Sequence, residues 1–102
     1  MAQLVVTYKT PQDTAAFDKY YAETHVALAK KIPGLRKYQI SQGPVTSLTG
    51  ASDAYLIAIL TFDSAAAIQA GLASADGQAA AADLPKFATG GVDLILFDTK
   101  DL

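Results

Sequence analysis

The sequence predicts an α+β fold in which helices cover one face of a four-stranded antiparallel sheet. Runs of β-branched and aromatic residues occur four times along the chain. Segments with helical spacing of apolar residues separate the first run from the second and the third from the fourth. The resulting order, βαββαβ, is that of the ferredoxin-like arrangement. The 102 residues have the length of one domain, so we expect a single domain over residues 1–102.

The first half begins with a strand and a long helix. Residues 3–9, QLVVTYK, form a short β-branched and aromatic run that predicts a strand. A helix is expected over residues 14–31, ended by Pro33–Gly34, because apolar side chains recur there at spacings of three and four. The predicted buried stripe of this helix consists of Phe17, Tyr21, Thr24, Leu28 and Ile32.

A second strand is expected over residues 35–41, LRKYQIS, where side chains alternate between two faces and one face is polar. Arg36, the sole arginine, either pairs with a carboxylate ligand or is a solvated strand residue, and the second interpretation is favoured. Lys30 and Lys31 lie in the last turn of the preceding helix, where cations interact favourably with the helix dipole. Capping therefore explains this lysine pair better than ligand binding does.

The second half repeats the pattern with one extra helix. The residues 43–52, GPVTSLTGAS, indicate a loop between the halves rather than a domain boundary. Asp63 or Ser64 can cap the next helix, and the alanine-rich stretch after it has high helix propensity. The predicted elements are a strand at 54–62, a helix carrying Ile68 and Leu72, a short helix ending near Leu84–Pro85, and a strand at 92–98.

Composition excludes several classes of function. The formal net charge is -2 and the pI is about 5.0, so no basic field attracts nucleic acid or an anionic membrane. No segment approaches the roughly 20 apolar residues of a membrane span, and no targeting signal is visible, so we expect a cytoplasmic protein. With no cysteine and one histidine, a cysteine zinc site is excluded, and so is a multi-histidine site within one chain. The sequence predicts neither a metal nor a cofactor.

Both faces of the predicted sheet are apolar. A sheet covered by helices on one face should alternate apolar and polar residues, but the third and fourth strands do not. The third divides Tyr55, Ile57 and Ile59 from Leu56, Leu60 and Phe62, and the fourth divides Leu94 and Leu96 from Ile95 and Phe97. We expect a homodimer in which a second copy covers the open face, since a monomer would expose a large apolar patch.

Two segments, FDKYYAETHVALAKKIPGLRKY and GQAAAADLPKFATGG, together resemble the EthD family of ethyl tert-butyl ether degradation. The resemblance covers nearly the whole chain and implies a dimeric α+β barrel. The wider superfamily includes cofactor-free monooxygenases of polyketide aromatics, polyketide cyclases, lactone isomerases and haem-degrading enzymes, whereas EthD itself is an accessory protein. EthD-like proteins tend to carry proline two residues after the histidine of the first helix. Ala27 in this place implies a straighter helix and a differently shaped pocket.

His25, the only histidine, is the candidate catalytic residue. At about 100° per residue it lies at the border of the buried stripe, where it and Tyr21 can flank a cleft between helix and sheet. An imidazole there can act as general base or donate a hydrogen bond to an oxyanion. The alternative is a half-buried structural histidine, bonded to a backbone carbonyl and water. The resemblance places His25 at the family's histidine position and raises the catalytic interpretation to equal standing.

The candidate substrate-binding residues are aromatic. Packing is the competing explanation for each of them, because aromatic side chains in strands and helices mostly fill cores. Asp83 in DLPKF is interpreted as a helix-end or turn residue. The candidates are Tyr21, Tyr8 and Phe87, and the strand tyrosines Tyr38 and Tyr55 are more typical of packing.

Two hypotheses of function follow. One is a small cofactor-independent enzyme of the monooxygenase, cyclase or isomerase type, acting on an apolar aromatic or polyketide-like ligand in a pocket between sheet and helices. The alternative is a non-catalytic accessory or ligand-binding protein of a degradative oxidation pathway, which would tolerate loss of His25. A third, weaker hypothesis makes His25 an axial ligand of haem.

Overall fold

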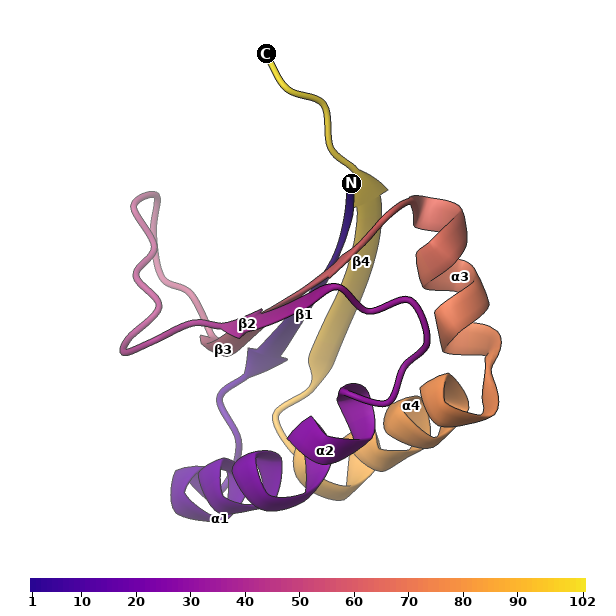
Figure 1. The fold of residues 1–102 in the computed structure, drawn as a ribbon. Coiled ribbons are helices and arrows are strands. Elements are labelled where there is room, and N and C mark those ends of the chain that lie inside the picture. Colours follow the sequence, from indigo (N-terminus) through magenta and orange to yellow (C-terminus); the bar gives the residue numbers. More distant parts are fainter.

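The computed structural model describes residues 1–102 and contains one four-stranded antiparallel sheet (Figure 1). Its strands are β1 (Ala2–Lys9), β2 (Lys37–Ile40), β3 (Ala54–Phe62) and β4 (Val92–Asp98). They lie in the order β2-β3-β1-β4, with β1 paired to both β3 and β4. The two strands nearest the middle of the chain, β2 and β3, also pair. The predicted ferredoxin-like fold is therefore confirmed.

The helices lie on one side of the sheet, and the segment between β2 and β3 projects away from it (Figure 1). Each of the longer helices starts at a side chain that accepts a hydrogen bond from a free backbone N–H: Asp13, Ser64 and Ser74. Ser64, rather than Asp63, therefore caps the helix after β3. The helical segments are α1 (Thr14–Tyr20), the π-helical η1 (Tyr21–His25), α2 (Val26–Ala29), α3 (Ala65–Ala73) and α4 (Ala75–Phe87).

The first helix is not the continuous α-helix predicted over residues 14–31. At η1 the N–H of Val26 donates to the carbonyl of Tyr21, five residues earlier, which widens the turn. The wider turn changes the phase of the helix, so the expected stripe is wrong at two positions: Thr24 is exposed and Leu28 is only half-buried. The buried residues are Phe17, Tyr21, His25, Ala29 and Ile32.

Ala27 lies in α2, directly after this turn. A π-helical turn is itself a recognised cause of helix bending. The absence of proline at position 27 therefore does not make the first helix regular.

The last helix is longer than predicted. It continues past Leu84–Pro85 to Phe87, with Pro85 inside its final turn. Asp83 is therefore a helix residue rather than a turn residue, and it lies on the buried face of α4 together with Gly77, Ala80 and Phe87. These positions are spaced by three or four residues, so they share one side of the helix.

The core lies between the helices and the facing side of the sheet. Side chains from alternate positions of β1 and β3, such as Leu4 and Leu60, are opposite each other in the strand register and fully buried there. The opposite side of the sheet has no covering element. It carries the predicted apolar side chains, with Ile95 59% exposed, together with polar ones such as Gln3, Thr61 and Asp93. Its apolar residues, called the open face below, are Val5, Ile57, Ile59, Ile95 and Phe97.

Tyr55 does not lie on the open face, so the strand alternation that grouped it with Ile57 and Ile59 is wrong at this residue. Tyr8 pairs with Leu56 and Lys9 pairs with Ala54, so Tyr55 is the extra residue of a β-bulge. Its ring makes an edge contact with Phe17, with centroids 5.4 Å apart, and its hydroxyl donates to Asp18. The bulge thus directs Tyr55 toward α1.

Candidate active site

A small apolar pocket lies between the sheet and the helices. Its cavity volume is about 40 Å³, and none of its lining side chains is a lysine, arginine, aspartate or glutamate. The lining residues whose side chains carry a polar group are His25, Tyr8 and Tyr38. The remaining lining residues are Leu4, Val6, Ala29, Ile32, Ala58, Leu60, Leu72, Gly77, Ala80, Ala81, Leu84 and Leu94.

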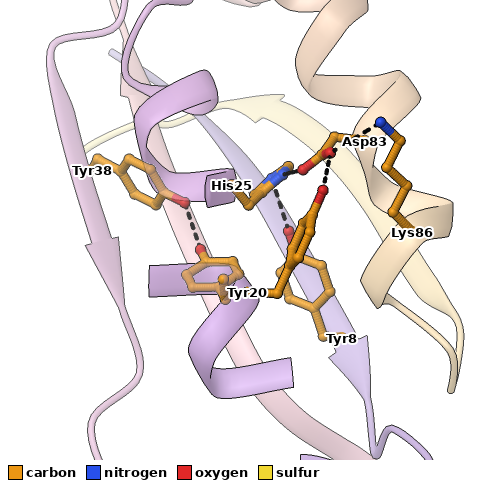
Figure 2. Close-up of polar contacts among 7 residues, drawn as sticks. Tyr8, Tyr20, His25, Tyr38, Asp83 and Lys86 are labelled. Atoms are coloured by element: carbon orange, nitrogen blue, oxygen red, sulfur yellow. Dashed lines mark hydrogen bonds and ion pairs between the residues drawn. The ribbon is translucent and has the colours of Figure 1, made fainter. Parts of the chain in front are cut away.

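His25 lies between an acidic and a phenolic partner (Figure 2). The imidazole is buried, at 5% exposure. Its Nδ1 is 3.0 Å from Oδ2 of Asp83 on α4, and its Nε2 is 3.4 Å from the hydroxyl of Tyr8 on β1. Three elements far apart in the sequence therefore meet at one imidazole ring.

Asp83 is only 3% exposed, yet it has several donors around it. The Tyr20 hydroxyl donates to Oδ1 over 2.6 Å, and Nζ of Lys86 lies 3.9 Å from the same oxygen. Burial raises the pKa of Asp83, but the hydrogen bonds from Tyr20 and His25 and the charge of Lys86 lower it by more, so its pKa is below the usual value. Asp83 is therefore a carboxylate at neutral pH.

Burial lowers the pKa of His25 below its usual 6.5, and the opposing hydrogen bond and charge of Asp83 do not offset this effect. The imidazole is therefore neutral at neutral pH. A neutral imidazole has one N–H donor and one nitrogen with a free lone pair. His25 can thus accept a proton at one nitrogen while the other remains bonded.

The tyrosines at the pocket wall, Tyr8 and Tyr38, and Tyr21 behind it are neutral donors. Burial is the main cause that raises the pKa of Tyr8, Tyr21 and Tyr38 above the usual 10.0 of tyrosine. The hydroxyls of Tyr21 and Tyr38 are hydrogen-bonded to each other. The pocket therefore combines a neutral base with phenolic donors in an uncharged wall.

Of the four predicted site residues, two meet at the pocket wall, His25 and Tyr8. Tyr21 and Phe87 lie behind them in an aromatic cluster: the Phe87 ring centroid is 4.7 Å from that of His25, and Tyr21 contacts both rings. Arg36 lies away from the pocket, in an exposed ion pair with Asp63. It is not placed to bind a ligand there.

The sequence interpretation missed Asp83 and Tyr20. A signal for Asp83 was present, because it falls three residues after Ala80 and four before Phe87, on the apolar face of a helix. A carboxylate on such a face needs a buried partner. No comparable signal existed for Tyr20, which is half-buried beside Tyr21 and reaches Asp83 only through the tertiary fold.

No group of three or more histidine, cysteine, aspartate or glutamate side chains is arranged to hold a metal ion. None of the helices combines the length and hydropathy needed to cross a membrane. Axial ligation of haem by His25 would require Nε2 to leave its contact with Tyr8, since Nδ1 is bonded to Asp83, and a pocket of about 40 Å³ leaves no room for a haem.

The model of the EthD domain family matches residues 9–91, a range that contains His25 and Asp83. The chain belongs to the EthD family. This EthD-family chain is 39% identical, over 98% of its length and 96% of the relative, to an uncharacterized 11.0 kDa protein in the thcB-thcC intergenic region of Rhodococcus erythropolis. It is also similar to the crystal structure of an EthD family protein from Bacillus halodurans. That similarity has a TM-score of 0.87 and 33% identity over 98% of this chain and 99% of the other.

More distant structures share the fold alone. SnoaB, a cofactor-independent oxygenase from Streptomyces nogalater, has a TM-score of 0.67 and 19% identity, covering 99% of this chain and 94% of its own. A dimeric ferredoxin-like protein of unknown function from Thermobifida fusca has a TM-score of 0.68 and 15% identity, covering 96% and 90%. At these identities, neither similarity assigns an activity to this EthD-family protein.

Proposed function

We propose that this EthD-family protein is a small cofactor-independent enzyme that removes a proton from an apolar aromatic or polyketide-like ligand, with His25 as general base. The observation that carries the proposal is the buried imidazole of His25, whose Nδ1 contacts Asp83 and whose Nε2 contacts Tyr8 at the wall of an uncharged pocket. A general base must be deprotonated at the working pH, and burial lowers the pKa of His25 so that its imidazole is neutral. The oxygenase activity of SnoaB, on the same fold, is compatible with this chemistry.

The proposed step is a proton transfer. A proton leaves a carbon next to a carbonyl group, or a phenolic oxygen, and binds to a nitrogen of His25. The electron pair stays on the ligand as an enolate or phenolate, and the Tyr8 hydroxyl can donate a hydrogen bond to the new negative charge. Isomerisation and ring closure can both start from such an anion, whereas oxygenation would also consume dioxygen.

The pocket selects against charged ligands. It offers no cation to a carboxylate or phosphate, and burying such an anion without a partner is costly. Its volume of about 40 Å³ accommodates only about three water molecules. A ring-sized ligand therefore requires the pocket to open, and its neutral, apolar part would fill the space between sheet and helices.

We also propose that the protein is a homodimer joined through the open face. Five apolar side chains there, each worth about 1.5 to 3 kcal/mol on burial, would contribute a gross gain on the order of 10 kcal/mol before the costs of association. The dimeric state of the Thermobifida fusca protein, which shares the fold, supports this arrangement.

Proton abstraction can be tested without knowing the natural substrate. Phenylacetone carries C–H groups beside both a ring and a carbonyl, and their exchange in D₂O is followed by NMR. We expect the protein to accelerate this exchange, and His25→Asn to lose about 100-fold or more of the acceleration. Asparagine can still donate to Asp83, so the variant removes the base and keeps the buried carboxylate bonded. Equal rates for protein and variant would contradict the general-base role.

The small molecule that the protein binds distinguishes the accessory-protein alternative from the enzyme. Native mass spectrometry of protein purified gently from its own host, beside His25→Ala, reports any small molecule that stays bound. A bound aromatic molecule that the variant loses supports a site at His25. A ligand retained by both proteins, together with no exchange of the probe, would favour the accessory role.

A further inference from the structure

We infer that Asp83 is a positioning residue that sets the tautomer of His25, and that Tyr20 is a second positioning residue that orients Asp83: the proton sits on Nδ1, and the lone pair of Nε2 faces Tyr8 and the pocket. The inference deepens the proposed function and rests on it, because only an Nε2 lone pair can receive a proton from a ligand in the pocket. The tautomer itself can be measured with no ligand present.

The contacts of Asp83 decide the position of the proton. An ionised carboxylate accepts hydrogen bonds and has none to donate, so Nδ1 of His25, 3.0 Å from Oδ2, must be the donor. The neutral ring has a single N–H, so Nε2 is left with its lone pair. Tyr8 does not decide the matter, because its hydroxyl can donate or accept over the 3.4 Å to Nε2.

Tyr20 assigns the two carboxylate oxygens of Asp83 to different partners. Its hydroxyl donates to Oδ1 over 2.6 Å, and Lys86 lies 3.9 Å from that same oxygen (Figure 2). Oδ2 is therefore left for His25. The two donors on the Oδ1 side also keep Asp83 ionised when His25 takes up a proton, so the new imidazolium meets a negative charge.

Other groups around the imidazole offer no competing charge. Tyr8 approaches from β1, Tyr21 from η1 and Phe87 from α4, and none of them is ionised at neutral pH. Asp83 is thus the single group that distinguishes the two ring nitrogens of His25.

Nitrogen NMR of the imidazole tests the inference. Because the chain has one histidine, the imidazole signals of uniformly ¹⁵N-labelled protein report His25 alone. At neutral pH we expect a protonated, pyrrole-type Nδ1 and an unprotonated, pyridine-type Nε2. A wild-type spectrum with the proton on Nε2, or with both nitrogens protonated, overturns the inference.

Asp83→Asn should reverse the tautomer. The Tyr20 hydroxyl donates to the Oδ1 position and the charge of Lys86 lies on the same side, so the amide oxygen of asparagine would face them and its NH₂ would face Nδ1. Nδ1 must then accept, and the proton moves to Nε2. Phenylacetone exchange should fall about 100-fold or more, since the lone pair at the pocket is lost. An unchanged Nδ1–H tautomer in folded Asp83→Asn would overturn the role of Asp83.

Tyr20→Phe tests the second positioning residue and does not remove the buried charge. We expect the Nδ1–H tautomer to persist, with a shifted Nδ1–H signal and faster exchange of that proton with water. Tyr55→Phe is the matched control, because Tyr55 donates to Asp18 over 2.9 Å in a similar pair away from His25. His25 signals that move no more in Tyr20→Phe than in Tyr55→Phe would exclude Tyr20 from this role.

The spectra also separate the inference from the proposed function. If the tautomer is as inferred and the wild-type protein exchanges no probe, only the enzyme proposal fails. If exchange depends on His25 and the tautomer is reversed, only the positioning role fails. Should Asp83→Asn not fold, the wild-type spectrum and Tyr20→Phe still decide.

Discussion

At the scale of single residues, His25 exchanges hydration for two protein partners, and this exchange makes the stability of the fold depend on pH. Burial favours the neutral imidazole, while Asp83 favours the charged form and only partly offsets the burial. The hydrogen bonds from Tyr20 and His25 lower the pKa of Asp83, so its carboxylate stays ionised at pH values below the usual pKa of aspartate. Both groups therefore bind fewer protons in the native state than in the unfolded chain, and acid should destabilise the protein.

The pH dependence has two windows. The pKa of His25 is 6.5 when unfolded and lower when native, so its contribution is present above pH 6.5 and lost as pH falls toward the native pKa. The contribution of Asp83 is present above 3.8 and lost as pH falls below it. Urea unfolding at a series of pH values should show the first loss in the wild type and not in His25→Asn. The same loss in both proteins would mean that another group causes it.

At the scale of the elements, the close approach of α3 and α4 depends on a glycine. A Cβ at position 77 would lie 2.6 Å from the Cα of Leu72 and closer still to the carbonyl oxygen of Gly71. Both contacts are with backbone atoms, which cannot move aside as a side chain can. Gly77 also lines the pocket and donates its N–H to the capping Ser74.

Gly77→Ala should therefore destabilise the protein although alanine is the better helix former. Alanine gains up to about 1 kcal/mol of helix propensity, but forced separation of the helices costs about 3 kcal/mol. Thermal unfolding measures the net loss, and Ala79→Ser, on the exposed side of the same helix, serves as the control. An unchanged melting temperature for Gly77→Ala would show that α3 and α4 separate without cost.

At the scale of the whole molecule, the open face is an apolar surface that no other part of the chain covers. All helices lie on the other side of the sheet (Figure 1), and Ile59, Ile95 and Phe97 remain exposed. A contiguous apolar surface of this kind is typical of an interface between proteins. A second copy would bury it with the same residues on both sides.

Sedimentation velocity should therefore detect a dimer, and Ile95→Lys should weaken it. The lysine would bury a charge without a partner, which we expect to raise the dissociation constant about 100-fold or more. Leu48→Lys is the control, because Leu48 is 94% exposed on the β2–β3 loop and does not belong to the open face. A wild-type protein that sediments as a monomer at micromolar concentration would contradict the dimer.

By itself, the sequence determined the order of the elements, the helix-side core of the sheet and the apolar character of its other face. These features follow from the spacing of apolar residues, which is two in a strand and three or four in a helix. Such spacing can be read along the sequence. The resemblance to the EthD family, confirmed by the match over residues 9–91, also directed attention to His25.

Only the tertiary structure decided the chemistry around that histidine. The π-helical turn at η1 brings His25 fully into the core, and the bulge at Tyr55 reverses one side chain, neither of which apolar periodicity reveals. The bond from His25 to Asp83 joins residues 58 positions apart. Such a contact depends on how α4 packs against the first helix, and packing is a property of the folded chain rather than of any segment. The partner of a buried imidazole therefore becomes visible only in the fold.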